Sequence, residues 1–213
     1  MMWLMQRHVS LLTGGLLLLL AGQVAAQAPN GATEALYAQR FTAQCAACHG
    51  DRGVSSLALT PSLAGQHSFY AITQLFLFRQ GRRDNPVMAA VAKDMSDDDL
   101  RGFSDHIGRL PAQATAAPSP MITPAPAPSD TASLDRGAAL ARQLHCGSCH
   151  GADYAGGGQV PRLAGQRHDY LLHALQGFRS GQRLGYTPAM NEALAGVAAP
   201  DIDALALYLA RLR

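Results

Sequence analysis

Apolar residues recur at helical spacing in two stretches that lie 100 positions apart in the chain. In 67–80 the apolar positions are Phe69, Ile72, Leu75 and Phe76. In 167–180 they are Tyr170, Leu171, Ala174, Leu175 and Phe178. Spacings of three and four residues bring such side chains onto one face of a helix. The pattern therefore predicts two amphipathic helices, each with one buried face.

Two further helices are predicted around each of these. An earlier pair, over about 33–47 and 134–148, leads into a cysteine-containing stretch. A later pair begins at Ser96, which acidic residues follow as in a capping box, and at Pro200, since proline suits the first helical turn. Strand-like alternation of useful length is absent from the sequence, which therefore predicts an all-α fold.

The two halves of the chain resemble each other. The segment PSLAGQHSFYAITQLFLFRQG (61–81) aligns with PRLAGQRHDYLLHALQGFRSG (161–181). We therefore predict two homologous domains, at 27–110 and 133–213, joined by a Pro/Ala-rich linker at 111–132 that holds six of the twelve prolines. Proline-rich linkers can be extended, so the sequence leaves open whether the domains are packed together or held apart.

The first 26 residues are typical of an export signal. Arg7 provides the positive flank, 11–22 is an apolar run, and small residues occupy 24–26. An uncleaved membrane anchor is the alternative, although this run is shorter than the ~20 residues that span a bilayer. We predict a signal peptide at 1–26 and a periplasmic protein, and loose membrane association stays open.

Composition and charge narrow the range of possible functions. Apolar residues make up 48% of the chain, charged residues 15%, and the formal net charge is +2. This composition is typical of a folded protein, and no basic patch for nucleic acid is visible. Lys93 is the only lysine, which excludes a docking face built on a ring of lysines.

The four cysteines fall in two Cys-x-x-Cys-His motifs, one in each predicted domain. The motif residues are Cys45, Cys48, His49, Cys146, Cys149 and His150. A zinc site would usually combine both cysteine pairs, a thioredoxin-like pair would need a βαβ context, and two disulfides would leave the histidines unexplained. A histidine directly after Cys-x-x-Cys is typical of covalent haem c attachment, with the histidine as iron ligand. The sequence thus predicts two haem c groups.

A second iron ligand is predicted at Met88 and Met190. They follow the motif histidines by 39 and 40 residues, each two positions after a proline, in a predicted loop before the last helix. Methionine ligation raises the reduction potential. Met95 aligns with Val197 and is predicted to be a core residue. Histidine ligation is the alternative, but the free histidines do not recur at matching positions: His67, His106, His145, His168 and His173.

Other residues are predicted to surround the haems. Pro61 and Pro161 follow the motif histidines by 12 and 11 residues, and their carbonyls are expected to accept the second N–H of each histidine; ordinary turn prolines are the alternative. Tyr70 and Tyr170 are expected in the core or at the haem edge. Four arginines near the repeated F-R-x-G are candidates for binding haem propionates, or are solvated: Arg79, Arg83, Arg179 and Arg183.

The repeated motifs CAACHG and CGSCHG, with PSLAGQ and PRLAGQ, resemble those of dihaem class I cytochromes c, most closely the cytochrome c4 family. The resemblance implies two tandem class I cytochrome c domains, packed with their haems close. His49 and Met88 would ligate the first iron, and His150 and Met190 the second. It also implies a periplasmic electron carrier that passes electrons towards a terminal oxidase.

Iron with two protein ligands has no open position for a substrate, so the sequence predicts an electron carrier and no enzyme. Its partners would be redox proteins, such as a quinol-oxidising complex as donor and a terminal oxidase as acceptor, docking through a small interface near the haem edge. Three alternatives stay open: a haem subunit of a dehydrogenase complex, a dihaem peroxidase, and a haem or small-ligand sensor.

Overall fold

The computed structural model describes residues 31–112, 128–183 and 188–213; the predicted signal peptide and most of the predicted linker fall outside the described residues. Within these ranges the chain is helical, with one isolated bridge and no strand, which confirms the all-α fold class there. The helices are α1 (Gly31–Gln44), α2 (Ala46–His49), α3 (Ser68–Arg79), α4 (Pro86–Ala92), α5 (Asp97–Arg109), α6 (Pro128–Gln143), α7 (Cys146–His150), α8 (His168–Arg179), α9 (Ala189–Leu194) and α10 (Ala199–Arg211).

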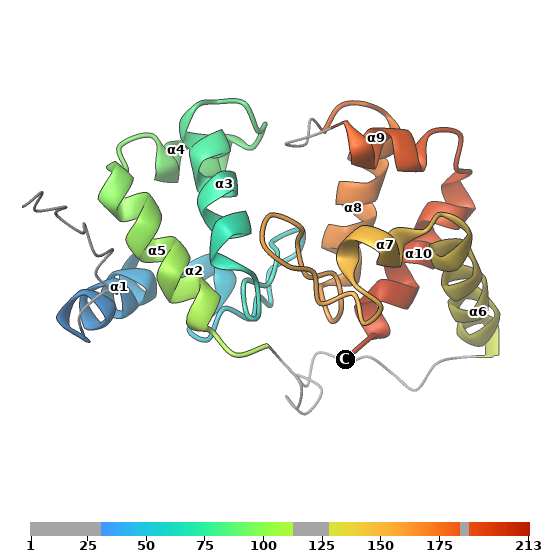
Figure 1. Ribbon diagram of the computed structural model, residues 1–213, viewed down its shortest axis with the longest axis horizontal. Helices are drawn as coiled ribbons and strands as arrows, with labels where there is room; N and C mark the ends of the chain where they lie inside the picture. Colours follow the sequence, from blue (N-terminus) through green and yellow to red (C-terminus); the bar gives the residue numbers. More distant parts are fainter. Residues whose placement is uncertain (1–30, 113–127, 184–187) are drawn as a thin grey trace, which may run out of the picture.

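The helices form two groups that lie next to each other, α1 to α5 and α6 to α10 (Figure 1). In each group the last helix is the centre of packing: α1 and α3 pack on α5, and α6 and α8 pack on α10. Each group has its own apolar core, with Phe41 and Phe103 fully buried in the first and Ile202 and Leu205 in the second. The repeated sequence thus folds as two separate helical domains.

Helix starts follow the capping signals in the sequence. The Ser96 hydroxyl accepts from the Asp99 N–H at 3.1 Å, and the Asp99 carboxylate accepts from the Ser96 N–H at 3.1 Å, which completes the predicted capping box of α5. In the second domain α10 begins at Ala199, one residue before the predicted Pro200. Both predicted starts are correct to within one residue.

Three predictions about the elements are wrong. Helix α6 begins at Pro128, ahead of the predicted 134 and inside the predicted linker, because proline is well tolerated in a first helical turn. Met88 and Met190 lie in the short helices α4 and α9, where loops were predicted. On α3 the buried residues are Ala71, Leu75, Leu77 and Phe78, while the predicted Phe69 and Phe76 are 53% and 41% exposed.

Two glutamines form hydrogen bonds between the domains. The domains are therefore packed together, a point that the proline-rich linker left open. Gln66 Nε2 donates to Arg162 O at 2.7 Å, and Arg162 N donates back to Gln66 Oε1 at 3.1 Å. Gln166 makes the same pair of bonds with the backbone of Ser62, both at 2.8 Å. Both glutamines are buried, and each occupies the same place in the repeated L-A-G-Q. The domains therefore pack through a pseudo-symmetric exchange of side-chain-to-backbone bonds.

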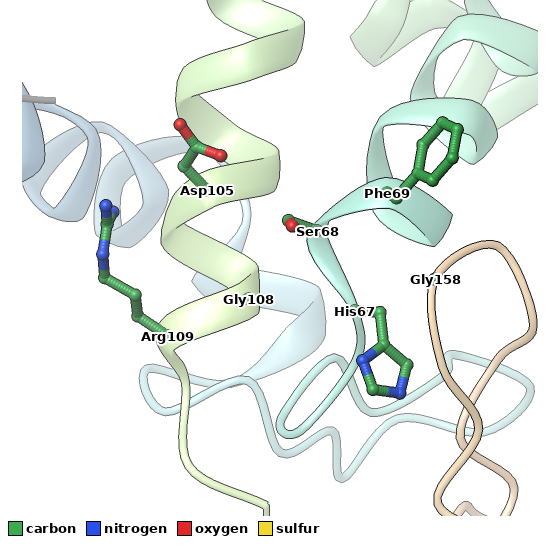
Figure 2. A pocket seen from close by; sticks show the side chains of 7 residues that line it. All are labelled: His67, Ser68, Phe69, Asp105, Gly108, Arg109 and Gly158. Atoms are coloured by element: carbon green, nitrogen blue, oxygen red, sulfur yellow. The ribbon is translucent and has the colours of Figure 1, made fainter. Parts of the chain in front are cut away.

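A cavity of about 350 Å³ opens beside this junction, between the start of α3, the end of α5 and a loop of the second domain (Figure 2). It is lined by His67, Ser68, Phe69, Asp105, Gly108, Arg109 and Gly158. None of these residues belongs to the cysteine motifs, so the cavity is no candidate for the predicted cofactor. Among the described helices, none combines the length and apolar character needed to cross a bilayer.

Candidate cofactor sites

Each Cys-x-x-Cys-His motif forms a single helical turn that ends in a buried histidine. The first turn is α2, which follows directly on Cys45 and ends at His49, 7% exposed. The second is α7, which begins at Cys146 and ends at His150, 5% exposed. All four cysteines are free thiols, and the second cysteine of each motif is exposed. The motifs are therefore folded alike, with no disulfide between their cysteines.

A proline carbonyl orients each of these histidines. His49 Nδ1 lies 2.9 Å from Pro61 O, and His150 Nδ1 lies 2.9 Å from Pro161 O, as the spacing of the two prolines predicted. A carbonyl only accepts, so Nδ1 carries the proton and Nε2 keeps a free lone pair. Burial lowers the pKa of both histidines and outweighs this hydrogen bond, which raises it. Both imidazoles are thus neutral and available as metal ligands.

The two methionines are held on their short helices by different means. In the first domain the Asn85 side chain caps α4 and accepts from Met88 N at 2.9 Å. In the second, Asn191 Nδ2 donates to the carbonyls of Phe178 at 2.7 Å and Arg183 at 3.3 Å. Each methionine is partly buried against the core of its own domain. The two asparagines were not anticipated from the sequence, because they occupy different positions in the two repeats.

The remaining histidines are engaged elsewhere or exposed. His67 Nε2 contacts Ala155 O across the domain junction at 2.9 Å, and the His106 ring packs on Phe41. His168 lies 3.2 Å from Asp203, His145 precedes α7, and His173 is exposed. Met95 is buried in the first core, where it was predicted. The structure therefore does not bring a second histidine to a matching place in the two domains.

The four candidate arginines divide into two pairs. Arg79 donates to Met95 O at 2.9 Å and to Asp97 at 2.8 Å, and Arg179 donates to Val197 O at 3.1 Å. These two fasten α3 and α8 to the segments that precede the last helices. Their bonds are internal to each domain, so we assign them a structural role.

The other two arginines meet at the domain junction. Arg83 Nη2 and Arg183 Nη2 donate to the Tyr170 hydroxyl at 3.0 and 3.2 Å, and Arg83 also donates to Gln74 at 2.6 Å. Burial alone would raise the pKa of Tyr170, but the charges of Arg83 and Arg183 outweigh it and lower that pKa. Burial and the neighbouring Tyr170 raise the pKa of Tyr70. Both tyrosines therefore lie at the junction, where the two domains meet.

The residues present fit the predicted haem. Two neutral histidines present a free nitrogen, and the paired thiols stand one helical turn apart for two thioether bonds. Within the described residues, neither Arg83 nor Arg183 forms an ion pair with a carboxylate. Two half-buried cations without an anion are suited to the propionate groups that a haem carries.

Comparisons with protein families match both halves of the chain. A family model described as cytochrome c matches residues 134–213, and one described as cytochrome c oxidase, cbb3-type, subunit III matches residues 32–107. Among solved structures, reduced recombinant cytochrome c4 from Pseudomonas stutzeri superposes with a TM-score of 0.72 at 26% identity. That superposition covers 84% of this chain and 98% of that protein, so it includes both domains.

Curated relatives cover nearly the same span. Cytochrome c-552 of Acidithiobacillus ferridurans is 32% identical over 92% of this chain and 84% of its own length. Cytochrome c4 of Thiocapsa roseopersicina is 31% identical over 78% and 85%. A protein of Stutzerimonas stutzeri named thiosulfate dehydrogenase electron acceptor is 32% identical over 79% and 78%. These relatives match along both domains and the junction between them.

Proposed function

Since the chain belongs to the dihaem cytochrome c4 family, we propose that it is a periplasmic electron carrier that passes electrons towards a terminal oxidase. Membership confirms two of the predictions, the tandem cytochrome c domains and the two covalently bound haem c groups. It also identifies a dihaem protein of electron transfer, related to a dehydrogenase electron acceptor. The cellular location, the oxidase and the iron ligands belong to the proposal.

We propose that His49 and Met88 bind the first iron, and that His150 and Met190 bind the second. The observation that carries this assignment is the repetition of the whole arrangement. In both domains a buried neutral histidine is oriented by a proline carbonyl, and a methionine lies on a short helix against the same core. Both domains thus keep the same two candidate ligands at matched positions of the repeat.

The protein's part in electron transfer is to keep each site rigid. A haem c with two protein ligands gives or accepts one electron, and the chain supplies the ligands, the burial and the orientation. The Pro61 and Pro161 carbonyls fix the rings of His49 and His150. The bonds of Gln66 and Gln166 hold the two domains in one arrangement. Little movement then accompanies a change of oxidation state in either domain.

We assign no enzymatic activity to the protein, because the proposed iron ligands leave no place for a substrate. If a histidine and a methionine hold each iron, as proposed, no position would stay open there for peroxide or another substrate. The export segment predicted at 1–26 supports the periplasmic location. Methionine ligation favours a high reduction potential, which suits donation to an oxidase.

The test uses the exported protein with both haems attached. Its mass should exceed that of the polypeptide by two haem groups. After reduction with ascorbate, it should be re-oxidised rapidly by membranes that contain a terminal oxidase, and cyanide should block this reaction. Carbon monoxide should leave the spectrum of the reduced protein unchanged. Carbon monoxide binding, or catalytic turnover with hydrogen peroxide, would show an open iron and would replace the carrier with a peroxidase-type enzyme.

A second candidate function is to accept electrons from a sulfur-compound dehydrogenase. The thiosulfate dehydrogenase electron acceptor, 32% identical over 79% of this chain, favours it. Thiosulfate with a purified thiosulfate dehydrogenase should then reduce both haems, and thiosulfate alone should not. If the enzyme and thiosulfate leave both haems oxidised, this candidate is excluded while the carrier function stands.

A further inference from the structure

Helix α4 presents an uncharged apolar face to solvent. Its exposed residues are Pro86, Val87, Ala90 and Val91, which we call the α4 face. Val87 is 65% exposed and Val91 is 39% exposed. Spacings of three and four residues make Val87 a neighbour of Ala90 and Val91, and Pro86 a neighbour of Ala90, on the helix surface. Solvent-exposed valines of this kind need an explanation when they form a group.

The α4 face lies next to the proposed iron ligand. Met88 is on the same helix and turns inward, where it packs against the core of the first domain with Ala92. A partner seated on Val87 and Val91 would therefore be separated from Met88 by one helical turn at most. If Met88 holds the first iron, as proposed, a partner docked there would lie close to the first haem.

The second domain does not repeat this face. Helix α9, which lies at the same end of the molecule as α4 (Figure 1), exposes Ala189, Glu192 and Ala193 at the positions of Val87, Ala90 and Val91. The alanines are smaller, and Glu192 adds a negative charge. Among the described residues the large exposed apolar side chains all lie in the first domain: Leu36, Leu57, Leu59, Phe69, Phe76, Val87 and Val91.

Charges at the rim of the α4 face cancel. Arg82 and Asp84 precede the helix and are exposed. Lys93 and Asp94 follow it as an exposed ion pair at 3.7 Å. Two positive and two negative charges leave no net field to attract an acidic or a basic partner. The surface that matches such a face is itself apolar and electrically neutral.

We propose that the α4 face is the docking surface of the first domain for redox proteins that carry an uncharged apolar patch over their own cofactor. The proposal rests on the proposed function and on Met88 as an iron ligand. A small apolar contact of this kind gives a short-lived complex, which suits a carrier that must release each partner. Helix α9, which carries Glu192, does not offer the same uncharged face.

The experiment measures electron self-exchange of the full-length dihaem protein. A second copy of the chain is a suitable probe, because its own α4 face is apolar with a neutral rim. Oxidised protein is added to reduced protein, and NMR follows the broadening of the Met88 and Met190 methyl signals. Self-exchange has no driving force, so a change in reduction potential does not by itself change the measured rate.

We expect the exchange seen at Met88 to change less than twofold between 50 and 500 mM salt. Ala90→Glu, which gives α4 the residue found on α9, should slow this exchange at least tenfold and make it rise with salt, because two facing carboxylates repel and salt screens them. Val87→Ala with Val91→Ala should slow it several-fold. All three positions are exposed, so the fold should survive. The control Glu192→Ala should leave exchange at Met88 unchanged.

Exchange at Met88 that is unaffected by Ala90→Glu would overturn the proposal. Strong salt dependence of the wild-type protein would overturn it as well. Binding of the wild-type protein to phosphatidylcholine vesicles, lost on Val87→Glu, would assign the α4 face to a membrane surface instead. A missing Met88 methyl signal would contradict the proposed ligation and would be seen before any rate is measured, so the two failures are distinguishable.

Discussion

The two domains share one arrangement of helices but differ in the residues that they expose to solvent. Helices α3 and α8 are built on aligned sequences, yet Phe69 and Phe76 are exposed on α3, where α8 carries Asp169 and Gln176. Asp169 accepts from Leu59 N of the first domain at 3.0 Å, so this polar residue serves the junction. The comparison teaches that the repeat preserves the cysteine motifs and the helix packing, while the residues exposed on α3 and α8 differ between the domains.

The same contrast holds for the helices that carry the methionines. In the first domain Asn85 caps α4 at Met88 itself, whereas in the second Asn191 ties α9 to the end of α8. Both devices fix a short helix that has too few residues to be stable alone. The two methionines, which we propose as iron ligands, are therefore held by different hydrogen bonds.

The largest effect should come from replacing one methionine ligand. Met88→His should lower the potential of the first haem by a few tenths of a volt, within the range of about 0.8 V that axial ligands span. Met190→His should do the same for the second haem alone. Spectroelectrochemistry can resolve the reduction potentials of the two haems. The control is Met95→Val, which introduces the residue found at Val197 and should leave both potentials in place.

Breaking the junction should have the next largest effect. Gln66→Ala with Gln166→Ala removes four hydrogen bonds between the domains and leaves half-buried backbone groups of Arg162 and Ser62 without these partners. Each site should cost about 1 kcal/mol, because an unsatisfied buried group costs about 1–3 kcal/mol and a half-buried one lies at the lower end. Urea unfolding should change from one transition to two. The exposed Gln80→Ala is the control, and a single unshifted transition in the double variant would contradict this role.

Acid should destabilise the first domain through Asp99. The hydrogen bond from Arg40, with the bonds to Ser96, lowers the pKa of Asp99 to about 2 from the ordinary 3.8. The folded-state pKa is the lower one, so this stabilisation is full above pH 4 and is lost as pH falls through 2. Asp99→Asn should therefore lower the free energy of unfolding by about 2 kcal/mol at pH 7, and the difference should vanish near pH 2.

The ion pair of Asp201, which is the counterpart of Asp99 in the second domain, sharpens this prediction. Asp201 pairs there with Arg136, whose side chain is 60% exposed. A pair whose arginine is largely exposed contributes little, so Arg136→Gln should leave the free energy of unfolding almost unchanged at either pH. Equal effects of Asp99→Asn and Arg136→Gln in urea titrations at pH 7 would contradict the distinction.

The smallest effect should come from the cap of α4. Asn85→Ala removes the acceptor for Met88 N, which should cost about 1 kcal/mol. Imidazole competes with methionine for ferric iron, so it should bind the first haem about fivefold more tightly in this variant. Asn85→Asp keeps the acceptor and should behave like the wild-type protein. An unchanged imidazole affinity after Asn85→Ala would show that the cap does not support the ligand.

Much of the fold and site could be predicted because local signals were strong. The Ser96 capping box, the two Cys-x-x-Cys-His motifs and the spacing of Pro61 and Pro161 act over short distances in the chain. The short helix around Met88 could not be predicted, because seven residues give too little periodicity. The face of α3 was misread because Phe69 and Phe76 continue the apolar spacing of Ile72 and Leu75, although only the latter two pack against the core.

The junction needed the structure for a different reason. Gln66 and Gln166 stand at equal places in the repeat, but their partners lie 96 and 104 residues away. A repeated glutamine alone indicates a shared role without naming it. Only the structure of the packed domains shows that each glutamine forms hydrogen bonds with the backbone of the other domain.

The central claim is that each domain holds one haem between histidine and methionine and works as part of a carrier. The most direct test is a redox titration of the exported protein with both haems attached, following the haem bands by optical spectroscopy. We predict two high potentials that differ modestly between the domains. One high and one markedly low potential would mean that Met88 or Met190 is not a ligand, and a dihaem enzyme would then be the better account.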